Sequence, residues 1–124
     1  MASRITAWCI DCVDPRRLAE FWTAVLGWVV TDTDEDGNVT IKSSADAPWG
    51  IDLFAVPDGP KRSKNRIHLD VNATDRDQDA ELERLLALGA TPADVGQRGD
   101  EEWHVLADPE GNEFCLLRRR LEPL

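Results

Sequence analysis

The chain has 124 residues, of which 42% are hydrophobic and 31% charged, and this composition fits one globular domain with its own core. Its 24 acidic and 14 basic residues give a formal net charge of −10, which repels polyphosphates and anionic lipids, so we expect no nucleic acid and no membrane as partner. No apolar stretch is long enough for a signal peptide or a membrane span, which predicts a cytoplasmic protein.

The first half of the chain predicts a strand, a helix and three further strands. Residues 5–12 favour a strand, and Asp14 and Pro15 then suit the N-cap and first turn of a helix. Apolar residues recur at helical spacing up to Gly27, which suits a left-handed C-cap. Strands are then expected at residues 28–31, 39–42 and 50–56, with Asp36-Gly37-Asn38 as the turn between the first two.

The second half repeats this order after a basic, breaker-rich linker at residues 58–65, which we interpret as a solvated connector. Residues 66–72 alternate as a half-buried strand requires, with His68 and Asp70 on the polar face. Thr74, with Asp77 three residues later, suits the start of a helix that ends at Gly89. Strands are expected at residues 91–95, 102–107 and 113–118, and residues 108–112 form the turn between the last two.

The two halves predict an α+β fold made of two βαβββ units, at about residues 4–57 and 66–120, within a single domain. Each unit is too small to bury its own sheet face. We therefore expect all eight strands to form one curved mixed sheet, with the helices on its outer face and a cleft on its inner face.

Cysteine and tryptophan are the residue types whose usage needs an interpretation. Three cysteines is an odd number, and Cys9 and Cys12 flank a strand-like segment, which argues against a disulfide framework and a zinc knuckle. Five tryptophans without any tyrosine is a heavy indole content. We interpret most of them as core residues, while some can line a ligand site.

Several motifs resemble one known superfamily. They are Val13-Asp14-Pro15, Phe21-Trp22, Leu26-Gly27, Ile67-His68-Leu69-Asp70-Val71, Leu88-Gly89-Ala90, and Asp108-Pro109-Glu110-Gly111-Asn112 with Glu113-Phe114. In this order they resemble the glyoxalase, bleomycin-resistance and extradiol-dioxygenase superfamily, whose architecture is the vicinal oxygen chelate fold. The resemblance is greatest to its small glyoxalase-like members.

The resemblance also implies where a metal would be held. In metal-using members four ligands point into the cleft, and the corresponding positions here are Ala7, Asp52, His68 and Cys115. Alanine has no donor atom, and Cys115 stands where the family usually has glutamate, so we predict no metal cofactor. The alternative is a divalent metal such as zinc on Asp52, His68 and Cys115.

Strand parity extends these positions to a pocket that needs no metal. The resemblance adds that Trp103 and Val105 face into the cleft. The predicted ligand-binding residues are Asp52, Phe54, His68, Asp70, Trp103, Val105, Glu113 and Cys115. The same parity places Trp8 beneath the helices together with Trp22.

An apolar, aromatic cleft with a few polar groups is typical of a small-molecule site. The sequence therefore predicts a metal-independent protein that binds a small apolar, planar or cationic molecule, in a resistance or sequestration role like that of the superfamily's antibiotic-binding members. The alternatives are a lyase, isomerase or dioxygenase-like enzyme that uses a reduced metal site or His68 as acid or base, and an interaction module without an occupied cleft. The resemblance also implies a homodimer.

Overall fold

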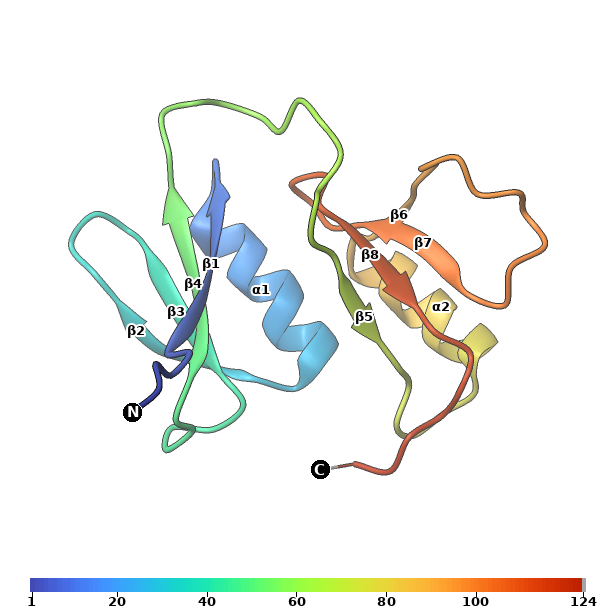
Figure 1. Ribbon diagram of the computed structural model, residues 1–124, viewed down its shortest axis with the longest axis horizontal. Helices are drawn as coiled ribbons and strands as arrows, with labels where there is room; N and C mark the ends of the chain where they lie inside the picture. The colour runs from blue at the N-terminus through green and yellow to red at the C-terminus, as the bar shows by residue number, and fades with distance from the viewer. Residues whose placement is uncertain (124) are drawn as a thin grey trace. The chain divides into compact units, whose positions relative to one another are not determined.

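The computed structural model describes residues 1–123 and divides the chain into unit 1, which ends at Lys61, and unit 2, which begins at Arg62. Each unit contains one helix and four strands in the same order, so the α+β class and the two βαβββ units are confirmed (Figure 1). Unit 1 contains β1 (Ala7–Cys12), α1 (Pro15–Leu26), β2 (Val29–Thr33), β3 (Val39–Lys42) and β4 (Gly50–Ala55). Unit 2 contains β5 (Leu69–Val71), α2 (Gln78–Leu88), β6 (Thr91–Pro92), β7 (His104–Ala107) and β8 (Glu113–Leu116).

The strands form two mixed sheets of four strands, one in each unit. The strand orders are β1-β4-β3-β2 and β5-β8-β7-β6, and in both sheets the first strand of the unit runs parallel to the last. All other neighbours are antiparallel. We predicted one continuous sheet, but β1 and β5 each stand at a sheet edge, and no backbone ladder among residues 1–123 extends either sheet beyond four strands.

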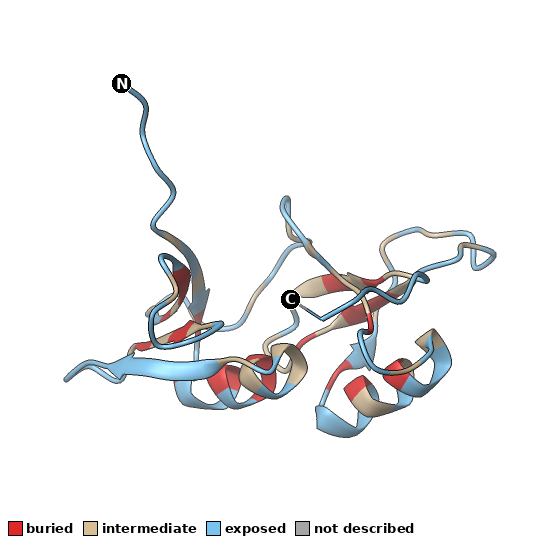
Figure 2. Cartoon of the chain, turned by 90° about the horizontal axis from the view of Figure 1, so that it is seen from below, coloured by how far each residue is buried: buried red, intermediate tan, exposed pale blue. Residues whose placement is uncertain are grey.

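Helix α1 supplies much of the core of unit 1. The Asp14 carboxylate accepts a hydrogen bond from the Arg17 N–H at 3.2 Å, and Gly27 ends the helix in the left-handed conformation, with φ of 67°. Its buried side chains include Leu18, Phe21 and Trp22, and Figure 2 colours the buried residues of the helix red. The helix packs on β3 and β4. Burial of this face anchors the helix on the sheet.

Helix α2 begins later than the sequence predicted. The Asp77 carboxylate accepts a hydrogen bond from the Ala80 N–H at 2.8 Å, so Asp77 is the N-cap and Gln78 the first helical residue. The expected start at Thr74 is wrong, because the residue that satisfies the free N–H groups of the first turn is Asp77. Neither helix in residues 1–123 has the length and apolar character needed to cross a bilayer.

Two turns with the pattern Asp-x-x-Gly-Asn join hairpins in the two units. The Asp34 carboxylate accepts hydrogen bonds from the N–H groups of Asp36 and Asn38, both at 2.9 Å, and from the Asn38 side-chain amide at 3.0 Å. The Asp108 carboxylate makes the matching bonds to Glu110 and Asn112 at 2.9 to 3.0 Å. The first turn joins β2 to β3 and the second joins β7 to β8, so one local sequence closes hairpins at different positions in the units.

Strand ends and one tryptophan differ from the sequence expectation. The ladder between β5 and β8 begins at Leu69 opposite Phe114, and Ile67, expected in the buried face of this strand, is 67% exposed. Residues 66–68 are therefore not part of the strand, because no partner continues the ladder there. Trp8 lies opposite the buried Ile51 but is 41% exposed, so its predicted burial with Trp22 is wrong.

Candidate functional site

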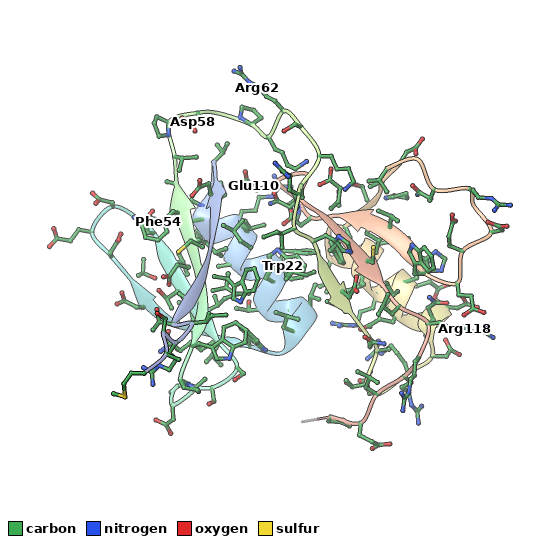
Figure 3. All side chains as sticks on the ribbon, viewed as in Figure 1. Trp22, Phe54, Asp58, Arg62, Glu110 and Arg118 are labelled. Atoms are coloured by element: carbon green, nitrogen blue, oxygen red, sulfur yellow. The ribbon has the colours of Figure 1, made fainter. Side chains whose placement is uncertain are left out.

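Unit 2 contains a cavity of about 430 Å³, a volume typical of small-molecule sites. Its lining includes residues that the sequence nominated for ligand binding: His68, Asp70, Trp103, Val105, Glu113 and Cys115. The remaining nominated residues, Asp52 and Phe54, belong to β4 of unit 1, and Figure 3 labels Phe54 on that strand. Neither of them lines this cavity.

The ladder of unit 2 explains why three of the lining residues share one face. Cys115 on β8 lies directly opposite Asp70 on the parallel neighbour β5 and directly opposite Val105 on the antiparallel neighbour β7. Residues opposite one another in adjacent strands project from the same face of a sheet. The sheet itself therefore brings a carboxylate, a thiol and a valine side chain together.

His68 joins this row from the residue that precedes β5. Its Nε2 atom lies 3.2 Å from Oδ1 of Asp70, and the two side chains are 47% and 49% exposed. A nitrogen of His68, a carboxylate oxygen of Asp70 and the Sγ atom of Cys115 all lie within 4.8 Å of one another. These three side chains are the chemically versatile part of the cavity, since they supply an imidazole, a carboxylate and a thiol.

The environment of Cys115 disfavours its thiolate. Burial raises the pKa of the thiol, and the negative charge of Asp70 raises it further, whereas Lys64 opposes the shift. The thiolate is the nucleophilic form of cysteine, so a raised pKa lowers the fraction available for attack. This arrangement is unlike that of an activated catalytic cysteine.

The apolar wall and the remaining charges come from β7, β8, the segment at residues 93–103 and the linker before β5. Trp103 is 45% exposed, while Val105 is buried. Glu113 accepts a hydrogen bond from the Asn65 N–H at 3.0 Å, which ties the end of the linker to the start of β8. The lining has three carboxylates, those of Asp70, Glu101 and Glu113, and one ammonium group, that of Lys64.

Sequence reasoning missed part of the lining. The residues it did not nominate are Lys64, Val95, Gly96, Gln97, Glu101 and Phe114. Most of them lie in the connection between β6 and β7, where hydrogen bonds from the Arg98 and Gly99 N–H groups lower the pKa of Glu101. Lys64 belongs to the linker that we expected to be a solvated connector. No periodic pattern marks these residues, and the closely spaced Gly96 and Gly99 were the available indication of a shaped loop.

Unit 1 places a related pair at the matching positions of its sheet. Cys9 on β1 lies opposite Asp52 on β4, with Sγ 4.0 Å from Oδ2. Thr40 donates a hydrogen bond to the other carboxylate oxygen of Asp52 at 2.6 Å. Ala7 stands two residues before Cys9, as His68 stands two residues before Asp70, so unit 1 has no imidazole there. Burial, Asp52 and Asp11 raise the pKa of the Cys9 thiol.

A second cavity, of about 480 Å³, lies in unit 1 among α1, β2 and β3. Its only charged lining residues are Arg16 and Glu20, which lie 3.6 Å apart as an ion pair one helical turn apart. The other polar side chains of its lining are Thr23 and Thr33, and it contains no histidine, cysteine or aspartate. Of the two cavities, the one in unit 2 therefore has the imidazole, the thiol and most of the carboxylates in its lining.

A family model described as "Glyoxalase-like domain" matches residues 7–117. Among solved structures, a mutant of the fosfomycin resistance protein FosX from Listeria monocytogenes, complexed with Mn(II) and 1S,2S-dihydroxypropylphosphonic acid, has 16% identity and a TM-score of 0.69, covering 94% of this chain and 90% of that one. A glyoxalase/bleomycin resistance protein/dioxygenase family enzyme from Burkholderia phytofirmans PsJN has 17% identity and a TM-score of 0.66, covering 92% and 97%. At these identities the structures show a shared fold. No curated protein matches the chain in sequence.

Proposed function

Because this chain belongs to the glyoxalase-like domain family, we propose that it binds a small planar, apolar or cationic molecule in the cavity of unit 2, without needing a metal. The observation that carries the proposal is the composition of the cavity wall. Trp103 offers an aromatic face to a planar group, and three carboxylates outnumber the single ammonium group. A cation is therefore favoured over an anion of the same size and shape.

The donor atoms of the cavity support binding without the kind of ion found in the FosX complex. That relative binds Mn(II), a hard ion that prefers several oxygen ligands. Here the clustered donors are one imidazole, one carboxylate and one thiol, and Ala7 adds no donor. The donor set therefore does not fit a hard ion such as Mn(II).

The proposal is tested by calorimetric titration of the EDTA-treated protein with two planar probes of similar size. The probes are proflavine, a cation, and anthracenecarboxylate, an anion. We expect saturable binding of proflavine and at least about tenfold weaker binding of the anion, which corresponds to about 1.4 kcal/mol. Equal affinities, or binding only after a metal is added, would contradict the proposal.

A matched pair of tryptophan variants locates the site. Trp103→Ala should weaken proflavine binding about 3- to 30-fold, because it removes the aromatic surface facing the cation. Trp8→Ala is the control, since Trp8 is similarly exposed, at 41%, but lies in unit 1. If both variants weaken binding equally, the probe does not bind against the Trp103 wall.

A second candidate function is acid–base catalysis by His68, favoured by its 3.2 Å distance to the Asp70 carboxylate. A carboxylate at this position can orient the imidazole and stabilise its protonated form. Mass spectrometry of each bound compound after incubation distinguishes catalysis from sequestration. A product formed by the native chain and lost in His68→Ala would establish an enzyme, whereas unchanged compound supports sequestration.

We also propose a homodimer, with β2 as the contact. This strand is the edge of its sheet, all five of its residues are exposed, and Val29 and Val30 give it an apolar surface. Open edge strands are common association sites. Light scattering at micromolar concentration should give the mass of a dimer, and Val30→Lys should give a monomer.

The cytoplasmic location expected from the sequence stays a prediction.

A further inference from the structure

We infer that His68, Asp70 and Cys115 together form a binding site for one zinc ion on the wall of the unit 2 cavity. The site goes beyond the proposed function, which concerns an organic molecule that binds without metal. It shares His68 and Cys115 with the ligand positions implied by the family resemblance, but its third donor is Asp70 instead of Asp52, so all three donors belong to a single unit.

The separations between the donors suit a single ion. All three lie within 4.8 Å of one another, and the His68 nitrogen and the Asp70 oxygen are 3.2 Å apart. Tetrahedral zinc, with bonds of about 2.0 Å to nitrogen and 2.3 Å to sulfur, separates its ligands by about 3.5 Å. The His68 and Asp70 side chains are about half exposed, so they can rotate toward an ion that also contacts the less exposed Cys115.

The sheet fixes the relative positions of the donors in advance. Asp70 and Cys115 lie opposite each other on hydrogen-bonded parallel strands, so the ladder fixes the distance between their Cα atoms. His68 stands two residues before Asp70, and its imidazole already contacts the Asp70 carboxylate. Binding therefore orders few side chains, which limits its entropic cost.

The mixture of donor elements selects the kind of ion. Zinc accepts nitrogen, oxygen and sulfur ligands, whereas calcium, magnesium and manganese prefer oxygen. Three protein ligands leave a fourth position for water or another group, and the half-exposed His68 and Asp70 side chains keep that position accessible. The surplus of carboxylates in the cavity also favours a cation.

Unit 1 provides a natural control for this inference. Cys9 and Asp52 bring a thiol and a carboxylate to 4.0 Å, the same two donor types on the same two strands of the unit. Ala7 supplies no third ligand, so we expect no comparable site there. The histidine is therefore the residue that gives unit 2 three donors where unit 1 has two.

The test is a titration of the reduced, metal-free full chain with Co²⁺, followed by displacement with Zn²⁺. A cysteine ligand gives Co²⁺ a sulfur-to-metal charge-transfer band in the near ultraviolet, so the spectrum reports the thiolate directly. We expect one equivalent of Co²⁺ to produce this band and one equivalent of Zn²⁺ to abolish it. Cys115→Ser should lose the band, and Cys9→Ser should keep it.

Two further variants address the other ligands. His68→Ala and Asp70→Asn should each weaken Zn²⁺ binding at least about tenfold. Losing a partner outside the ligand shell already costs about that much, and a direct ligand should cost more. Circular dichroism checks that each variant is folded. If Cys115→Ser does not fold, the metal binding of His68→Ala tests the inference instead, because the His68 side chain is half exposed and its loss should not unfold the chain. A band that persists without Cys115, a band that depends on Cys9, or no Co²⁺ binding would overturn the inference. Proflavine binding in EDTA is measured separately, so failure of one proposal leaves the other standing.

Discussion

The two units place a thiol beside a carboxylate on the same pair of strands, but in exchanged positions. In unit 1 the cysteine is on the first strand and the aspartate on the last, as Cys9 and Asp52. In unit 2 the aspartate is on the first strand and the cysteine on the last, as Asp70 and Cys115. Unit 2 also has an imidazole beside the pair, and these residues line its cavity. Residues that build the scaffold recur in both units, while the candidate chemistry depends on the residues that differ.

The units also differ in what their tryptophans do. Trp22 on α1 is 2% exposed and contacts Phe21 edge to face, with ring centres 5.1 Å apart, whereas Trp103 is 45% exposed on the cavity wall. Trp22 is therefore a core residue that stabilises the fold, whereas Trp103 is a residue that solvent reaches.

The largest expected effect comes from removing the buried indole. Trp22→Ala should lower the free energy of unfolding by about 3–5 kcal/mol, because it leaves a cavity in the core of unit 1. Trp103→Ala should change it by less than about 0.5 kcal/mol, as surface substitutions usually do. Urea unfolding of both variants provides the comparison, and equal losses would show that Trp103 is a core residue.

The next effect compares the two Asp-x-x-Gly-Asn turns. Asp108 is 3% exposed, so Asp108→Ala leaves its donors without partners and should cost about 1–3 kcal/mol in urea unfolding. Asp34→Ala should cost less, because water can replace the carboxylate at its exposed turn. A larger loss for Asp34 than for Asp108 would contradict the role of burial.

A gain of function tests whether histidine is what distinguishes the units. Ala7→His places an imidazole two residues before Cys9, as His68 stands before Asp70. We expect a second, weaker equivalent of Co²⁺ with its own charge-transfer band, abolished by adding Cys9→Ser. A spectrum identical to that of the native chain would mean that the unit 1 pair cannot complete a site.

The smallest effect is a dependence on pH at the Asp34 turn. The side-chain hydrogen bond from Asn38 is the main cause that lowers the pKa of Asp34 below its ordinary value of 3.8. The carboxylate therefore stabilises the folded state above the unfolded pKa, and this contribution is lost as the pH falls through the folded value. The stability difference between the native chain and Asp34→Asn should shrink below pH 3.8, in thermal melts at several pH values.

Strand parity is the reason that much of the candidate site could be predicted from sequence. Glu113 and Cys115 alternate on β8, and Asp70 lies opposite Cys115, so the period of two determines their common face, while His68 lies at the residue just before β5. Loop conformation has no such period, so Lys64 and Glu101 were missed. Thr74 and Asp77 are both residue types that cap helices, so residue type alone does not distinguish them, and the structure has Asp77 as the N-cap.

The parallel pairing of the first and last strands within each unit means that neither half borrows a strand from the other. Within residues 1–123, each backbone ladder begins and ends inside its own unit, and the connection around residues 58–65 belongs to no sheet. A gene rearranged so that residues 62–124 are translated before residues 1–61 would therefore keep all of its ladders.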